Sequence, residues 1–168
     1  IINGGGGTDT LKISTEGDAI KVGANVQSVE VVEVSSVNEL IVDTAGSTDV
    51  QTLKVMAANG EIEAKAAATT DVSVALKSTG AVAIDGGKNV TVALTGASDA
   101  AALEEAGDYR AIDIDGAAGD VSVSVVGANL TAQAGEVALG AIYVTGGKTI
   151  TVEQRAGDAS ALNTVGEG

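Results

Sequence analysis

The 168-residue sequence predicts an all-β fold, either a β-solenoid or an elongated β-sandwich. Short runs rich in Val, Thr and Ala begin roughly 9 to 11 residues apart, the spacing of successive strands in such folds. Apolar residues make up 45% of the chain but aromatic residues only 1%, so the core must be thin and aliphatic. Several runs alternate between apolar and polar residues, which is typical of strands with one buried face.

The predicted strands follow one another along most of the chain. They are Thr10–Ser14, Ala19–Val22, Val26–Val34, Glu39–Thr44, Val50–Ala57, Glu61–Ala66, Val72–Leu76, Ala81–Asp85, Val90–Leu94, Arg110–Asp115, Val121–Val126, Leu130–Ala134, Glu136–Leu139, Ala141–Thr145 and Thr149–Gln154. The alternation breaks at Val31 and Val32, which predicts a bulge or a bend between two sheet faces at this point.

One short helix is predicted near residues 98–107. Ser98 or Asp99 can cap its start, the segment Ala-Ala-Ala-Leu-Glu-Glu has high helix propensity, and Gly107 can close it. No linker rich in Pro or Ser separates two domains. We therefore expect a β-strand-rich module over residues 1–107 and a second, related β unit over residues 108–168, or one continuous domain over the whole chain.

An internal repeat supports two related units. Gly80–Val92 and Gly140–Val152 align without a gap, and more than half of the aligned residues are identical. Each copy consists of a strand, a Gly-Gly-Lys turn and a second strand. Paired glycines suit tight hairpin turns with positive φ, so this pattern predicts antiparallel neighbouring strands at both positions.

Charge and composition exclude several classes of function. The net charge of −14 argues against nucleic acid or an anionic membrane as a partner, and no apolar run approaches the roughly 20 residues of a membrane-spanning helix. The chain has no His and no Cys, which removes the usual general bases and thiol nucleophiles, so we expect no enzymatic activity. The start at Ile1, without a signal peptide, indicates a mature product or an excised module.

The turn before the first predicted strand matches the nonapeptide G-G-x-G-x-D-x-U-x of calcium-binding parallel β-helices, with Gly4, Gly5, Gly7, Asp9 and Leu11 at the defining positions. Glycines allow the backbone to curl so that its carbonyls point inward, and the aspartate adds the hard oxygen ligand that Ca²⁺ prefers. A single copy supplies half of a calcium cage, and the alternative is a flexible lead-in.

A second acidic segment, Asp113-Ile114-Asp115-Gly116-Ala117-Ala118-Gly119-Asp120, is a weaker calcium candidate. Asp113 and Asp115 would share one strand face, but the remaining acids of a calcium loop of the EF-hand type are missing. The alternative interpretation is a solvated strand edge.

Together these features resemble the calcium-dependent surface-layer (S-layer) and repeat-rich exported proteins of Gram-negative bacteria that are secreted through type I systems. The resemblance lies in the motif at Gly4–Lys12 and in the composition of the rest of the chain. It implies an extracellular β-rich module at the bacterial cell surface that assembles with calcium. It also implies that Asp9 and the carbonyls of Gly5 and Gly7 are the calcium ligands.

The expected function is therefore that of a structural module in a surface layer or filament, with copies of itself as the partner. The alternative is an adhesin or carbohydrate-binding domain that recognises a cell-surface glycan, with its ligand patch near Tyr109 or Tyr143.

Overall fold

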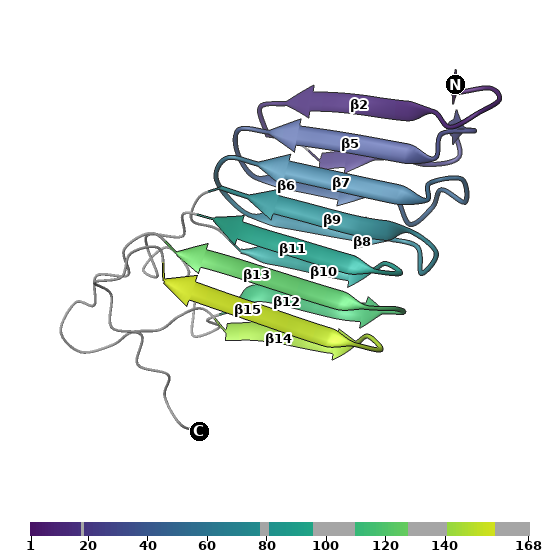
Figure 1. Cartoon of the computed structure of the whole chain (residues 1–168). Coiled ribbons are helices and arrows are strands. Elements are labelled where there is room, and N and C mark those ends of the chain that lie inside the picture. The colour runs from purple at the N-terminus through teal and green to yellow at the C-terminus, as the bar shows by residue number, and fades with distance from the viewer. Residues whose placement is uncertain (18, 78–80, 96–109, 128–140, 157–168) are drawn as a thin grey trace.

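The computed structural model describes residues 1–17, 19–77, 81–95, 110–127 and 141–156. Within these residues the chain forms 15 strands and no helix, which confirms the all-β prediction. Every strand pairing is parallel, and the chain winds through two stacked sheets (Figure 1), as in a β-solenoid.

The strands belong to two main sheets and one short pair. The seven-strand sheet contains, in spatial order, β2 (Thr10–Thr15), β5 (Val31–Ser36), β7 (Thr52–Ala57), β9 (Asp71–Leu76), β11 (Val90–Thr95), β13 (Val121–Gly127) and β15 (Ile150–Ala156). The six-strand sheet contains β3 (Ala19–Lys21), β6 (Leu40–Asp43), β8 (Ile62–Ala66), β10 (Val82–Gly86), β12 (Arg110–Ala117) and β14 (Ala141–Gly146). The short pair is β1 (Ile2–Asn3) with β4 (Val26–Gln27).

One coil of the solenoid is a strand of the seven-strand sheet followed by a strand of the six-strand sheet. The register places equivalent inward residues of successive coils on top of one another. Leu11, Val32 and Leu53 form such a column at even intervals along the chain, and Val72 and Val90 continue it. This column structure explains how a chain with so few aromatic residues can fill its core, because like aliphatic side chains stack directly.

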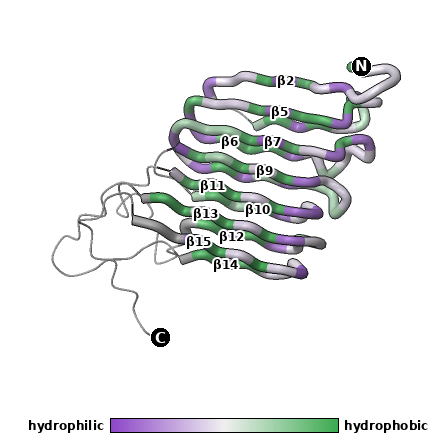
Figure 2. Tube along the Cα trace, in the orientation of Figure 1, coloured by the Kyte–Doolittle hydropathy of each residue, from purple (hydrophilic) through white to green (hydrophobic). Residues whose placement is uncertain are grey.

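The core consists of Val, Leu, Ile and Ala in the described part of the chain. Leu40, Leu53, Ile62, Ile112 and Ile114 are fully buried within it. Apolar and polar stretches alternate along the strands, and polar stretches also recur at the turns between them (Figure 2). Burial alternates along the strands as the sequence predicts, for example in β7, where the inward Leu53 and Val55 flank the exposed Lys54.

The Gly-Gly-Lys segments are not hairpin turns, and the prediction of antiparallel neighbours was wrong. Each segment links a strand of the six-strand sheet to the next strand of the seven-strand sheet, and those two strands pair only with strands of other coils. Gly86 and Gly87 adopt φ values of 85° and 90°, and Gly146 and Gly147 adopt similar values of 84° and 79°. Positive φ was predicted correctly, but here it turns the chain between sheets.

The predicted strand Val26–Val34 is interrupted by a corner at residues 28–30. Ser28 has a φ of 52° there, and Val29 is buried at the corner. β5 then begins at Val31, so a bend exists but lies just before the predicted position. The phase break in the sequence arises because the chain passes from one side of the coil to the next.

Three expectations concern residues outside the described part of the chain. These are the helix over residues 98–107 and the strands Leu130–Ala134 and Glu136–Leu139. The strands before and after residues 96–109 belong to the same two sheets, since β11 pairs with β13 and β10 with β12. The division into units 1–107 and 108–168 stays a prediction.

Candidate functional site

The glycine-rich segment forms the loop that leads into β2. Gly5 and Gly7 adopt φ values of 94° and 116°, so the loop uses backbone conformations that side chains other than glycine resist. The amide of Gly5 donates a hydrogen bond to Asn3 Oδ1 at 2.9 Å. A Cβ atom on Gly4 would lie 2.0 Å from the carbonyl oxygen of Ser28, so this position has no room for a side chain.

Asp9 lies where this loop meets the next coil. Its amide donates to Glu30 Oε2 at 2.8 Å, and its carbonyl oxygen accepts from the amide of Val31 at 3.0 Å. Its Oδ2 atom is buried without a hydrogen-bond partner. A buried carboxylate oxygen without a donor is costly, and a cation would compensate for that cost. This oxygen is the one feature of the loop that favours the calcium assignment.

Asp113 and Asp115 lie on β12, on the outward face of the six-strand sheet, as the sequence predicted. In register, Asp115 neighbours Asp85 on β10, and Asp113 neighbours Tyr143 on β14. Thr145 on β14 hydrogen-bonds Asp115 through its hydroxyl. Two carboxylates, those of Asp85 and Asp115, therefore stand on adjacent strands of one exposed face.

The structure does not bring the predicted metal ligands together. Asp9 precedes β2, the first strand of the seven-strand sheet, whereas Asp113 and Asp115 belong to β12, the fifth strand of the other sheet. No group of three or more acidic, His or Cys side chains able to hold a metal ion occurs among the residues that the structure describes. Calcium binding by Gly5, Gly7 and Asp9 or by the second pair stays a prediction.

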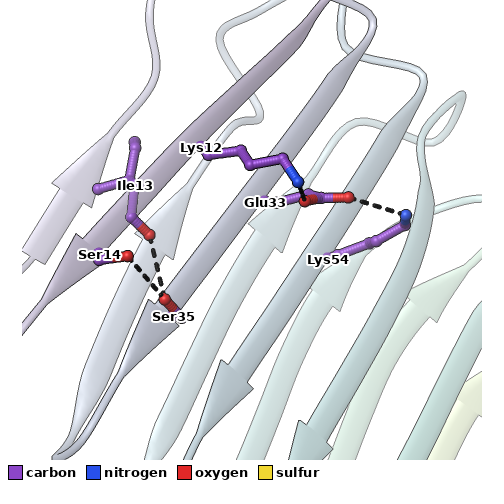
Figure 3. Close-up of polar contacts among 6 residues, drawn as sticks. All are labelled: Lys12, Ile13, Ser14, Glu33, Ser35 and Lys54. Atoms are coloured by element: carbon purple, nitrogen blue, oxygen red, sulfur yellow. Dashed lines mark hydrogen bonds and ion pairs between the residues drawn. The ribbon is translucent and has the colours of Figure 1, made fainter.

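A charged row crosses the outward face of the seven-strand sheet near β2. Glu33 on β5 lies between Lys12 on β2 and Lys54 on β7, at 2.9 and 3.0 Å (Figure 3). Hydrogen bonds from these two ammonium groups hold the pKa of the Glu33 carboxyl below its ordinary value. The three residues occupy one register column, so this row ties three consecutive coils together.

A similar row crosses the six-strand sheet. Lys21, Asp43, Lys65 and Asp85 hold successive positions on β3, β6, β8 and β10. Lys21 contacts Asp43 at 3.2 Å and Lys65 contacts Asp85 at 3.8 Å. Burial opposes ionisation of Asp43, but the Ala45 amide and the Lys21 ammonium outweigh it and hold the pKa of this carboxyl below its ordinary value. Opposite charges on adjacent strands favour this register over one shifted by a residue.

The sequence did not reveal the chemical character of the two ends of the stack. The first end consists of β2 and β3, and the last end consists of β14 and β15, each of which pairs on one side only within the described residues. Ile150 and Val152 on β15 point inward by register, yet both are 48% exposed, whereas Val121 and Val123 one coil earlier are 1% exposed. Ile150 and Val152 continue the same apolar pattern as their buried counterparts, so the local sequence does not set them apart.

Tyr143 lies on β14 at the last end and is 48% exposed. The other tyrosine, Tyr109, lies outside the part of the chain that the structure describes, so a glycan patch built from the two stays a prediction. No helix among the described residues has the length and apolar content to cross a membrane.

Comparison with known proteins gives no match to a protein-family model, to a curated protein or to a solved structure. Function is therefore inferred from the geometry of this chain alone.

Proposed function

We propose that this protein is a structural module of an extracellular bacterial assembly, a surface layer or a filament, whose copies associate with one another with the support of calcium. The observation that carries this proposal is the pair of stack edges, β2 with β3 and β14 with β15, that pair on one side only among the described residues. Strand edges with unpaired backbone groups are templates for pairing with another chain. Here they coincide with inward-facing apolar side chains that the chain leaves half exposed.

The sides of the stack support the same proposal. They carry ion pairs such as Lys12 with Glu33 and Lys21 with Asp43, which are well hydrated and suit a solvent-facing wall. Among the described residues, the large apolar side chains exposed on these walls are scattered over different strands, including Ile41 on β6, Met56 on β7 and Val126 on β13. A rigid body with polar walls and apolar ends is suited to linear assembly, as in repeat architectures where each unit contacts only its neighbours.

Analytical ultracentrifugation and negative-stain electron microscopy test the proposal. We expect polymers whose average length increases with protein concentration and which shorten when a chelator removes calcium. A strictly monomeric species at high concentration with calcium would refute the structural role. Polymers that are unchanged by chelator would refute only the calcium contribution.

Asp9→Ala separates these outcomes further. If the buried Oδ2 atom holds calcium, this variant should behave in calcium as the unaltered protein behaves in chelator. Glu16→Ala is the matched control, because it removes an exposed carboxylate that lies outside both calcium candidate segments. Equal behaviour of the two variants would remove Asp9 from the proposal.

A further inference from the structure

We propose that copies dock head to tail, with β15 and β14 of one copy adding in parallel to β2 and β3 of the next, so that the solenoid continues across the junction. This inference rests on the proposed self-association and specifies its surface and its register. The partner is a second copy of this chain.

The strand polarity determines this arrangement. Because all pairs in both sheets are parallel, the edge exposed on β15 is the one that β2 would meet if the stack continued. The same holds for β14 and β3 in the six-strand sheet. The two ends differ from one another, so the contact is heterologous, and repeating it by translation along the stack gives an open filament and not a closed dimer.

The register columns give the contacts. Ile150 is the last member of the column that starts at Leu11, and Val152 is the last member of the column that starts at Ile13. In the six-strand sheet Val144 ends the column to which Ile20 belongs. A docked copy therefore places aliphatic residues on aliphatic residues at each of these three positions.

Exposure identifies these positions as incomplete core. Within the stack the column of Ile13 and Val152 is buried, with Val34, Val55 and Val92 at 0% exposure. At the last end Val152 is 48% exposed, and at the first end Ile13 is only partly buried. A neighbouring coil would return these side chains to the environment that the other members of the column already have.

Among the described outward side chains of the terminal strands, Lys12 at the first end and Glu153 at the last end are opposite in sign. The first end presents Lys12 on β2 and Lys21 on β3. The last end presents Glu153 on β15, and Asp115 lies one strand behind β14. Docking in register places Thr145, which bonds Asp115, beside Lys21 of the next copy, and places Glu153 diagonally across from Lys12.

A disulfide test reads out this register directly, because the chain has no cysteine of its own. Lys12 and Thr151 share one outward column, at opposite edges of the seven-strand sheet. Six strand spacings of about 4.8 Å separate them by about 29 Å within one copy, far beyond the reach of a disulfide. Across the proposed junction they become direct neighbours.

The variant carrying both Lys12→Cys and Thr151→Cys should therefore form a ladder of covalent oligomers under mild oxidation, seen on non-reducing gels. The control carries Ser14→Cys and Thr151→Cys, which are two residues out of register, and should form far less of the ladder. Each single-cysteine variant should stop at dimers at most. Equal ladders from both double variants would overturn the inference.

Blocking variants provide a second test that needs no oxidation. Val152→Lys should block the last end and Leu11→Lys the first end, because a lysine on an edge prevents strand addition. Each variant alone should remain monomeric, and an equimolar mixture should form dimers and nothing larger. Circular dichroism confirms that each variant keeps its β structure.

The outcomes separate this inference from the proposed function. Polymers of the unaltered protein that show no register-specific crosslink, or that survive both blocking substitutions, would refute the head-to-tail junction and leave self-association in place. Absence of polymers from the unaltered protein would refute both.

Discussion

The corner glycines allow a sharp test of the fold, through a matched pair of substitutions at Gly86 and Gly116. Both residues end strands of the six-strand sheet or lie close to the end, and both have positive φ, 85° and 71°. They differ in the space around them. A Cβ on Gly86 would lie 2.2 Å from the carbonyl oxygen of Ala66, whereas a Cβ on Gly116 would approach nothing closer than 3.9 Å.

Positive φ costs an alanine about 1–2 kcal/mol, and this applies to both variants. Gly86→Ala must in addition displace the Ala66 carbonyl to reach an acceptable contact. That carbonyl accepts a hydrogen bond from the amide of Gly87 at 3.3 Å, which is worth about 1 kcal/mol. Overpacking adds about 1–3 kcal/mol. We expect Gly86→Ala to lower the free energy of unfolding by about 3–6 kcal/mol and Gly116→Ala by about 1–2 kcal/mol.

Urea titration followed by circular dichroism measures the two free energies, at a protein concentration low enough to keep all samples monomeric. The gain in unfolded-state rigidity is the same for both alanines and cancels in the comparison. Equal destabilisation of the two variants, or a larger effect of Gly116→Ala, would refute the corner geometry described for β10.

The remaining predictions concern the core, the corner hydrogen bonds and the charged rows. Leu53→Ala should cost about 2–5 kcal/mol because Leu53 is fully buried, and Met56→Ala on the same strand, 51% exposed, should cost less than about 0.5 kcal/mol in the same titration. Asn89→Ala should lower the free energy of unfolding by about 1–2 kcal/mol, because the Asn89 side chain accepts from the amide of Asp120 at 3.0 Å and donates to the Asp71 carboxylate at 2.8 Å. An unchanged urea midpoint would contradict this. The lowered pKa of Glu33 stabilises the fold fully above its ordinary value of 4.5, and this contribution is lost as pH falls through the lowered value. Glu33→Gln should therefore flatten the acid limb of stability against pH, and an unchanged acid limb would contradict this.

Much of the fold could be predicted because one local rule repeats in every coil. Alternation such as that around Lys54 predicts which residues face inward, and the scarcity of aromatic side chains predicts that the two sheets pack close together. The Gly-Gly-Lys segments were misread because positive φ at paired glycines is equally compatible with a hairpin and with a corner between sheets. Only the long-range pairing of β10 with β8 and β12 distinguishes the two.

The candidate site was less predictable. The conformations of Gly5 and Gly7 follow from the local sequence, but the surroundings of Asp9 include Glu30, which arrives from the next coil and accepts a hydrogen bond from the Asp9 amide. The stack edges have no local signature, since Ile150 and Val152 belong to the same pattern as their buried counterparts. Their exposure follows from position in the stack, which local sequence does not encode.

The column register also has a mechanical consequence. Neighbouring members of the inward column are unequally spaced along the chain, because the step from Val90 to Val121 contains much more chain than the step from Val72 to Val90, yet each step advances the stack by one strand spacing. A pulling force applied between β2 and β15 would therefore unfold the solenoid one coil at a time. Each event would release about 60–110 Å of slack at about 3.5 Å per residue, so the body would lengthen gradually under load instead of rupturing at once.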